Sequence, residues 1–321
     1  MIKRRIFCSG AAAIAAMPLG SLAQPGSARV VVGFPAGGVG DVLARRLTDL
    51  LRDSGYATSA IVENKPGAGG RLALDFLKAA PSDGLTMLLG PASVMTILPN
   101  AFAKPPFDPF TDFAAVGAVA DMDYVFTVNA KLPVTTLEQY LELARKDPLA
   151  ARYGTGGIGS GPHILGYLLS LETGTKIEHV PYRGGPLAFQ DLMGAQIPAT
   201  ITALSEPIVR NHKAGRLRAL AIAGRKRSVF LPDVPTFHEL GYPKLTMTDM
   251  NAVWVPGRTP GGQVERLSGL VRQVAQDSAF LGKFSMESLV LSPEALTQRL
   301  KTEHETMRAY VKAVGFTAAT P

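Results

Sequence analysis

Two glycine-rich turns constrain this chain more than any other feature, because each follows a strand-like run and precedes a helical pattern. The first covers residues 34–41 (FPAGGVGD) and the second covers residues 153–161 (YGTGGIGSG). Such a turn presents free backbone N–H groups at the start of a helix, and these groups bind a small anion without a charged side chain. Because the turns lie on separate halves of the chain, they predict a two-lobed receptor for a small anion.

The N-terminal 23 residues have the pattern of a signal peptide. Lys3-Arg4-Arg5 precedes an alanine-rich apolar run over 6–19, and residues 21–23 (Ser-Leu-Ala) form a small-x-small cleavage site. The run is shorter than the roughly 20 apolar residues that span a bilayer. The paired arginines also fit a twin-arginine signal, so the general secretory route and the twin-arginine route stay open. The sequence therefore predicts export to the periplasm.

Composition bounds the mature chain. Cleavage after Ala23 removes Cys8, the single cysteine, so a conventional core must provide stability without disulfides. Loss of the three basic leader residues lowers the formal net charge from +7 to +4, which does not indicate nucleic-acid binding. The remaining length predicts two domains, and alternating strand and helix patterns favour α/β layers with mainly parallel sheets.

Local signals predict several helix ends. Asp41 is placed to cap the helix after the first glycine turn, and Gly55 to end it. Thr135 and Glu138 have the spacing of a capping box. Gly174 is expected to stop the helix that follows the second glycine turn.

Two motifs near the second glycine turn allow an enzymatic interpretation and a simpler one. Residues 154–159 match G-x-G-x-x-G, but Pro162 interrupts the position where a dinucleotide site needs a regular helix, and export separates the chain from cytoplasmic NAD. Ser160 and His163 are the pair that an exported serine hydrolase would use, yet no acid is placed to complete a triad. The simpler interpretation is that Ser160 caps a helix with His163 in its first turn. The histidines show no zinc spacing, and we expect neither metal nor cofactor.

A series of short motifs runs in order along the chain. They are VGFPAGG with Asp41 at 32–41, VENKPGAGG at 62–70, DGLTMLLG at 83–90, FDP with DF at 107–113, YG with GPH at 153–163, HVPYRG at 179–184, LRALA at 217–221 and LPDVPT at 231–236. Together they resemble the Bug (Bordetella uptake gene) family, the extracytoplasmic substrate-binding proteins of tripartite tricarboxylate transporters. The resemblance runs from about residue 28 to residue 315.

The resemblance implies a type II periplasmic-binding-protein fold, in which two α/β lobes joined by two crossovers close on ligand like a Venus flytrap. It also implies a non-enzymatic, monomeric solute-binding protein that delivers a small carboxylate to membrane permease subunits. A ligand-presenting sensor subunit is an alternative. We expect residues 1–23 to be the signal peptide, residues 24–123 with 247–321 to form lobe 1, and residues 124–246 to form lobe 2.

The resemblance further implies that ligand contacts come chiefly from the two glycine loops, largely through backbone N–H groups and bridging water. Arg183 follows a strand and is a candidate for bidentate carboxylate binding, with an exposed loop charge as the alternative. Departures from the family pattern at Gly40, Tyr167 and 200–205 leave the ligand open. The expected ligand-binding residues are Phe34, Ala36, Gly37, Gly38, Gly40, Asp41, Ser93, Thr155, Gly156, Ser160, Gly161, His163, Tyr182 and Arg183.

Overall fold

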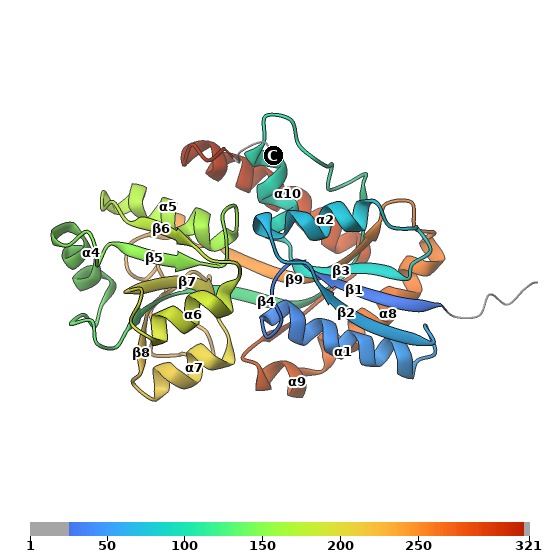
Figure 1. Ribbon diagram of the computed structural model, residues 1–321, viewed down its shortest axis with the longest axis horizontal. Coiled ribbons are helices and arrows are strands. Elements are labelled where there is room, and N and C mark those ends of the chain that lie inside the picture. Colours follow the sequence, from blue (N-terminus) through green and yellow to red (C-terminus); the bar gives the residue numbers. More distant parts are fainter. Residues whose placement is uncertain (1–25, 318–321) are drawn as a thin grey trace, which may run out of the picture.

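The computed structural model describes residues 26–317 (Figure 1). Strands and helices alternate along the chain and form two α/β groups that lie side by side, so the alternation expected from the sequence is confirmed. The long strand β4 (Phe113–Asn129) runs through both groups. No helix within 26–317 has both the length and the apolar character needed to cross a membrane.

The first group is a sheet of mixed direction, so the expectation of mainly parallel sheets is wrong, because β4 and β9 run antiparallel to their neighbours. Strand β1 is parallel to β2 and β3, and β9 runs antiparallel between β3 and β4. Its strands besides β4 are β1 (Ser27–Val32), β2 (Ser59–Asn64), β3 (Thr86–Pro91), β9 (Thr248–Pro256) and β10 (Glu287–Leu291). Its helices are α1 (Val39–Asp53), the 3₁₀ turn η1 (Ala68–Gly70), α2 (Arg71–Lys78), α3 (Ser93–Ala101), α8 (Gly261–Gln276), α9 (Ser278–Lys283) and α10 (Pro293–Ala313).

The second group has the same alternating plan. Strand β5 is parallel to β6 and β7, while β4 is antiparallel to β7 and β8. Its strands besides β4 are β5 (Arg152–Thr155), β6 (Glu178–Pro181), β7 (Ala199–Ala203) and β8 (Leu217–Ile222). Its helices are α4 (Leu137–Lys146), α5 (Gly161–Thr173), α6 (Gly185–Met193), α7 (Glu206–Lys213) and the 3₁₀ turn η2 (Pro243–Leu245).

Strand β4 changes partners near its middle. It pairs with β9 as far as Asp123, and from Tyr124 onward it pairs with β7 and β8. The last helix, α10, also joins the two groups, because Met307 and Val311 pack in the same hydrophobic cluster as Phe126 of the second group. The groups are therefore connected by strand pairing and by side-chain packing.

Burial explains why the first glycine loop starts where it does. Val30, Val31 and Val32 of β1 are all fully buried, as expected for a strand covered on both faces. Helix α1 then turns Leu43 and Leu47 into the core with the spacing of an amphipathic helix. Because both flanking elements are fixed in the core, the glycine loop between them is held at the edge of the sheet.

Two of the predicted helix ends are confirmed and one is displaced by a residue. Gly55 and Gly174 adopt left-handed φ angles of 67° and 62° at the ends of α1 and α5, so both are confirmed. The capping box at Thr135 is wrong by one residue. Thr136 is the N-cap of α4 and accepts a hydrogen bond from the Gln139 N–H at 3.2 Å. A capping box takes either Glu or Gln three residues after the N-cap, so Thr136 with Gln139 satisfies the pattern as well as Thr135 with Glu138.

Candidate functional site

A cavity of about 390 Å³ lies between the two groups, within the size range of small-molecule sites. We call it the cleft. Its walls come from both groups and from the two crossover strands β4 and β9. The lining residues are Phe34, Gly37, Gly38, Val39, Gly40, Pro91, Ser93, Val94, Met122, Tyr124, Gly156, Ser160, Gly161, Pro162, Gly185, Pro186, Phe189, Gln190, Thr202, Ala203, Ser205, Pro207, Ile208, Arg210 and Asn251.

Helix N-termini surround the cleft. The first residues of α1, α5, α6 and α7 lie at or beside the lining, and each helix begins with N–H groups that have no partner within the helix. Within 26–317, the N–H groups of Val39, Gly40, Gly161 and Gly185 have no backbone or side-chain acceptor. Because the positive ends of four helix dipoles meet here, the cleft favours an anion.

The N-terminus of α3 is already neutralised. The Ser93 N–H donates to Asp249 Oδ1 at 3.1 Å, and the Tyr124 hydroxyl donates to the other oxygen of the same carboxylate. Asp249 is only 2% exposed, and this burial raises its pKa. The network ties β4, β9 and α3 together beside the cleft, so its polar groups are already paired and offer no open anion site.

Asp41 shapes the first glycine loop from inside α1. It is not the N-cap, which is Gly38, so that prediction is wrong. Its carboxylate accepts from the Gly37 N–H at 3.0 Å and from Arg45 Nε at 3.0 Å. Burial works to raise the pKa of Asp41, but these hydrogen bonds outweigh it and hold the pKa below the usual value. Asp41 is buried and does not line the cleft. Its carboxylate is instead bonded to Gly37 and Arg45 of its own loop and helix.

A buried pair of histidines supports the second glycine loop. Thr155 Oγ1 lies 2.7 Å from His179 Nε2, and the rings of His163 and His179 pack against each other with centroids 4.1 Å apart and an interplanar angle of 39°. The Gly159 N–H donates to His163 Nδ1 at 3.1 Å. Burial lowers the pKa of His163 to about 3 and that of His179 to about 4, so both rings are neutral at pH 7. Neutral rings therefore hold the loop that presents N–H groups to the cleft.

The structure places eight of the expected site residues on the cleft wall and six away from it. Thr155 and His163 lie beneath the second loop, and Ala36 is exposed outside the first. Tyr182 donates to Asp191 at 2.8 Å, and Arg183 is exposed next to it. The expected residues on the wall are Phe34, Gly37, Gly38, Gly40, Ser93, Gly156, Ser160 and Gly161.

The hydrolase interpretation finds no support in the geometry. Ser160 occupies the N-cap position of α5, as the simpler interpretation predicted, but its side chain makes no capping hydrogen bond, because its hydroxyl donates to the Gly157 carbonyl at 2.7 Å. His163 already accepts from the Gly159 N–H, and no hydrogen bond joins it to Ser160 in the described part of the chain. The residues of 26–317 also contain no group of three His, Cys, Asp or Glu that could hold a metal ion.

Sequence reasoning missed the part of the wall formed by α6 and α7. These helices contribute Pro186, Phe189, Ile208 and Arg210, among others. A usable signal was present, because α5, α6 and α7 each have proline at the second helical position directly after a glycine or serine N-cap region. Proline near the first turn is pre-organised to start a helix, so the repeated pattern marks three helix N-termini, although it does not show that they meet.

The two groups touch at two glycine contacts beside the cleft. A Cβ added at Gly69 would lie 2.5 Å from the Ile158 carbonyl oxygen of the other group. Gly184 packs just as closely against Pro35, leaving no room for a side chain. The structure therefore shows the lobes in close approach, with glycine at the contact points.

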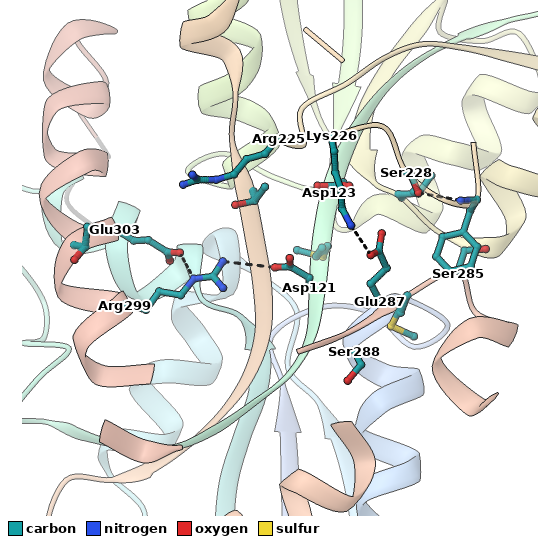
Figure 2. Close-up of a pocket in the computed structure, with 16 residues that line it drawn as sticks. Asp121, Asp123, Arg225, Lys226, Ser228, Ser285, Glu287, Ser288, Arg299 and Glu303 are labelled. Atoms are coloured by element: carbon teal, nitrogen blue, oxygen red, sulfur yellow. Dashed lines mark hydrogen bonds and ion pairs between the residues drawn. The ribbon is translucent and has the colours of Figure 1, made fainter. Parts of the chain in front are cut away.

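A second, larger cavity of about 780 Å³ contains Asp121 and Asp123 of β4, together with residues of both lobes (Figure 2). We call it the polar cavity. Figure 2 shows Arg299 between Glu303 and Asp121, with ion-pair distances of 2.8 Å and 3.5 Å. Lys226 pairs with Glu287 at 3.4 Å. Most charged side chains of the polar cavity are paired with one another in ion pairs. The cleft is therefore the better candidate for an exchangeable ligand.

Two α/β lobes that enclose a cavity surrounded by helix N-termini define a bilobed solute-binding protein. The chain matches the tripartite tricarboxylate transporter family receptor over residues 43–316, and it belongs to that family. It is thus a solute receptor of a tripartite transporter, not an enzyme, and the resemblance stated from the motifs is confirmed.

Relatives agree with this assignment. Protein BugT of Bordetella pertussis is 30% identical over 296 residues, which cover 89% of each chain. A solved periplasmic transporter is 30% identical, covers 91% of this chain and 98% of its own, and superposes with a TM-score of 0.84. The structure of Rpa4515 from R. palustris with adipate is 28% identical over 91% of this chain and 98% of its own, with a TM-score of 0.83. The periplasmic-binding-protein fold is therefore confirmed.

Proposed function

We propose that this receptor captures a small organic acid in the cleft, with a carboxylate held by backbone N–H groups of α1, α5 and α6. The observation that carries the proposal is the convergence of these three N-termini, with the free N–H groups of Val39, Gly40, Gly161 and Gly185, on one cavity. The adipate complex of the relative from R. palustris supports an organic acid as the class of ligand. Neutral donors suit a receptor that must release its cargo, because moderate affinity permits fast dissociation.

We also propose that ligand binding closes lobe 1 (24–123 and 247–321) on lobe 2 (124–246). The change of β4 partners between Asp123 and Tyr124 supports this division, and the close approach of Gly69 to Ile158 supports closure. The expected ligand contacts are the eight residues that line the cleft. Closure then follows from a ligand that contacts both lobes and so favours the closed state.

The test is a thermal-shift and calorimetric screen of the mature protein, from Gln24 onward, against mono-, di- and tricarboxylates and amino acids. A ligand at 100 times its dissociation constant is expected to stabilise the folded state by about 2.7 kcal/mol. The variant Ala203→Phe, which fills the cleft, is expected to lose this shift, whereas Ala214→Phe at the exposed end of α7 retains it. Binding that survives in Ala203→Phe would place the ligand elsewhere.

We further propose that the chain is exported by its N-terminal signal and acts as a monomer in the periplasm. The leader lies outside the described residues, so the sequence alone supports export. Replacing both Arg4 and Arg5 with lysine distinguishes the routes, because export is lost if the twin-arginine pathway is used and persists if the general pathway is used. Light scattering on the mature protein tests the oligomeric state.

A further inference from the structure

The charge in the cleft is concentrated at one position. Among the described residues that line it, Arg210 is the single charged side chain, and all others are neutral. Arg210 lies on α7, whose N-terminal residues Ser205, Pro207 and Ile208 form the same part of the wall. A single cation in an otherwise neutral wall attracts an anionic group of a ligand to that position.

The guanidinium of Arg210 has donors to spare. Its Nη1 lies 3.2 Å from Glu206 Oε1 one helical turn away, and its side chain is 62% exposed. Within 26–317 this ion pair is the only polar contact of the Arg210 side chain, so Nε and Nη2 have no acceptor. An exposed pair of this kind is weak and readily rearranged. The planar fork of arginine matches a carboxylate bidentately, which a backbone N–H does not.

Arg210 and the second glycine loop line the cleft from different helices of lobe 2. Helices α6 and α7 lie on one side of the lobe 2 strands, and α5 lies on the other (Figure 1). Helix α6 contributes Pro186, Phe189 and the polar Gln190 to the lining, and Phe34 and Val94 line the cleft from lobe 1. Because most of this lining is apolar, a ligand that reaches from α5 to α7 gains most from an apolar middle segment.

We propose that Arg210 is a specificity-determining residue that binds a second anionic group at the far end of the ligand. The preferred cargo is then an elongated acid with two anionic ends and an apolar middle. This inference rests on the proposed function, because the first carboxylate must occupy the helix N-termini. It adds a charged contact to a site that otherwise uses neutral donors.

The experiment measures dissociation constants by calorimetry for linear diacids of four to eight carbons and for the monoacids of equal length. It uses the mature protein, Arg210→Gln, and the control Lys213→Gln, which removes a positive charge from the same helix away from the cleft. We expect Arg210→Gln to weaken the best diacid roughly tenfold or more while changing the matched monoacid less than about twofold. Lys213→Gln is expected to change neither, and Arg210→Lys to recover part of the diacid affinity.

Each outcome has a distinct meaning. If the wild-type protein binds acids but Arg210→Gln weakens diacids and monoacids equally, or weakens neither, the role of Arg210 is overturned and the proposed function stands. The same holds if the wild type shows no preference for diacids over monoacids. If the wild type binds no acid at all, the proposed function fails and this inference fails with it. Melting temperatures of the unliganded variants confirm that the exposed substitutions leave the fold intact.

Discussion

The cleft and the polar cavity use charge in opposite ways. The cleft is built from neutral N–H groups at helix ends, with Arg210 as its only charged side chain among the described residues. The polar cavity is twice as large and holds acidic and basic side chains that mostly pair with one another. The difference teaches that a dense cluster of charges is not by itself a ligand site. A site for an exchangeable anion needs fixed donors whose partners are missing. The charged residues of the polar cavity are Asp121, Asp123, Arg225, Lys226, Glu287, Arg299 and Glu303.

The largest expected effect concerns the histidines beneath the second cleft loop. Because burial lowers the pKa of His163 to about 3 and of His179 to about 4, the unfolded chain takes up protons near pH 6.5 that the folded chain cannot bind. Stability is therefore complete above about pH 7 and falls as the pH drops toward 4. Each histidine is expected to cost about 2 kcal/mol at pH 5. Urea unfolding at pH 7.5 and pH 5.0 measures this loss.

Two variants isolate the histidine effect. His179→Gln can retain the contact with Thr155 and is expected to lose less stability between the two pH values than the wild type. His238→Gln replaces an exposed histidine and is expected to behave like the wild type. An unchanged pH dependence in His179→Gln would show that the ring does not support the cleft loop in the way described.

A glycine pair tests whether close approach of the lobes is needed for binding. Gly69 and Gly55 have nearly the same left-handed φ, 65° and 67°, but only Gly69 faces the other lobe. Alanine at either position is expected to cost about 1–2 kcal/mol of stability through backbone strain. Gly69→Ala alone must also displace the Ile158 carbonyl, so we expect its ligand affinity to fall about tenfold or more. Calorimetry with the best acid compares the two, and equal affinities would mean that binding does not require this contact.

The next prediction concerns Asp123, an acidic residue of the polar cavity. Burial, with the negative charges of Asp121 and Glu287, raises the pKa of Asp123 to about 6. The folded chain thus holds this proton more tightly than the unfolded chain, and ionised Asp123 destabilises the protein above pH 6. Asp123→Asn is expected to raise stability by about 1–2 kcal/mol at pH 8 and to lose that advantage below pH 4.

The control for Asp123 is Asp75→Asn, which removes an exposed acid from α2. Urea unfolding at both pH values is expected to show almost no change for this control. Stabilisation that is equal in both variants, or that persists at pH 4, would mean that burial of Asp123 is not its cause. Ligand affinity is expected to stay the same in both, since neither residue lines the cleft.

The smallest effect is expected at the ion pair between the lobes. Lys226 is 76% exposed and Glu287 34% exposed, so the pair is screened by water. Lys226→Ala is expected to change stability by less than about 0.5 kcal/mol and to leave the ligand preference unchanged. Denaturation and calorimetry measure both quantities. A tenfold change in affinity would reveal that the polar cavity controls closure and would remove the contrast drawn above.

The glycine loops were predictable because their geometry is encoded within about ten residues. A buried strand, a glycine turn and an amphipathic helix follow one another, and Gly37, Gly38 and Gly161 indeed reach the cleft wall. The direction of the polar side chains was not predictable in the same way. Asp41 and His163 lie in the correct segments, yet each points away from the cleft, since the residues packed beneath them decide which face they take.

The amino-acid sequence by itself determined the alternation of strands and helices, the two glycine loops and the family, because each depends on local patterns or on motifs in order. Only the tertiary structure brought α6, α7 and Arg210 to the same cavity as those loops, and only it separated the cleft from the polar cavity. Residues far apart along the chain meet through the pairing of β4 with β7, β8 and β9. Which helix ends converge depends on those long-range pairings, and no local pattern specifies them.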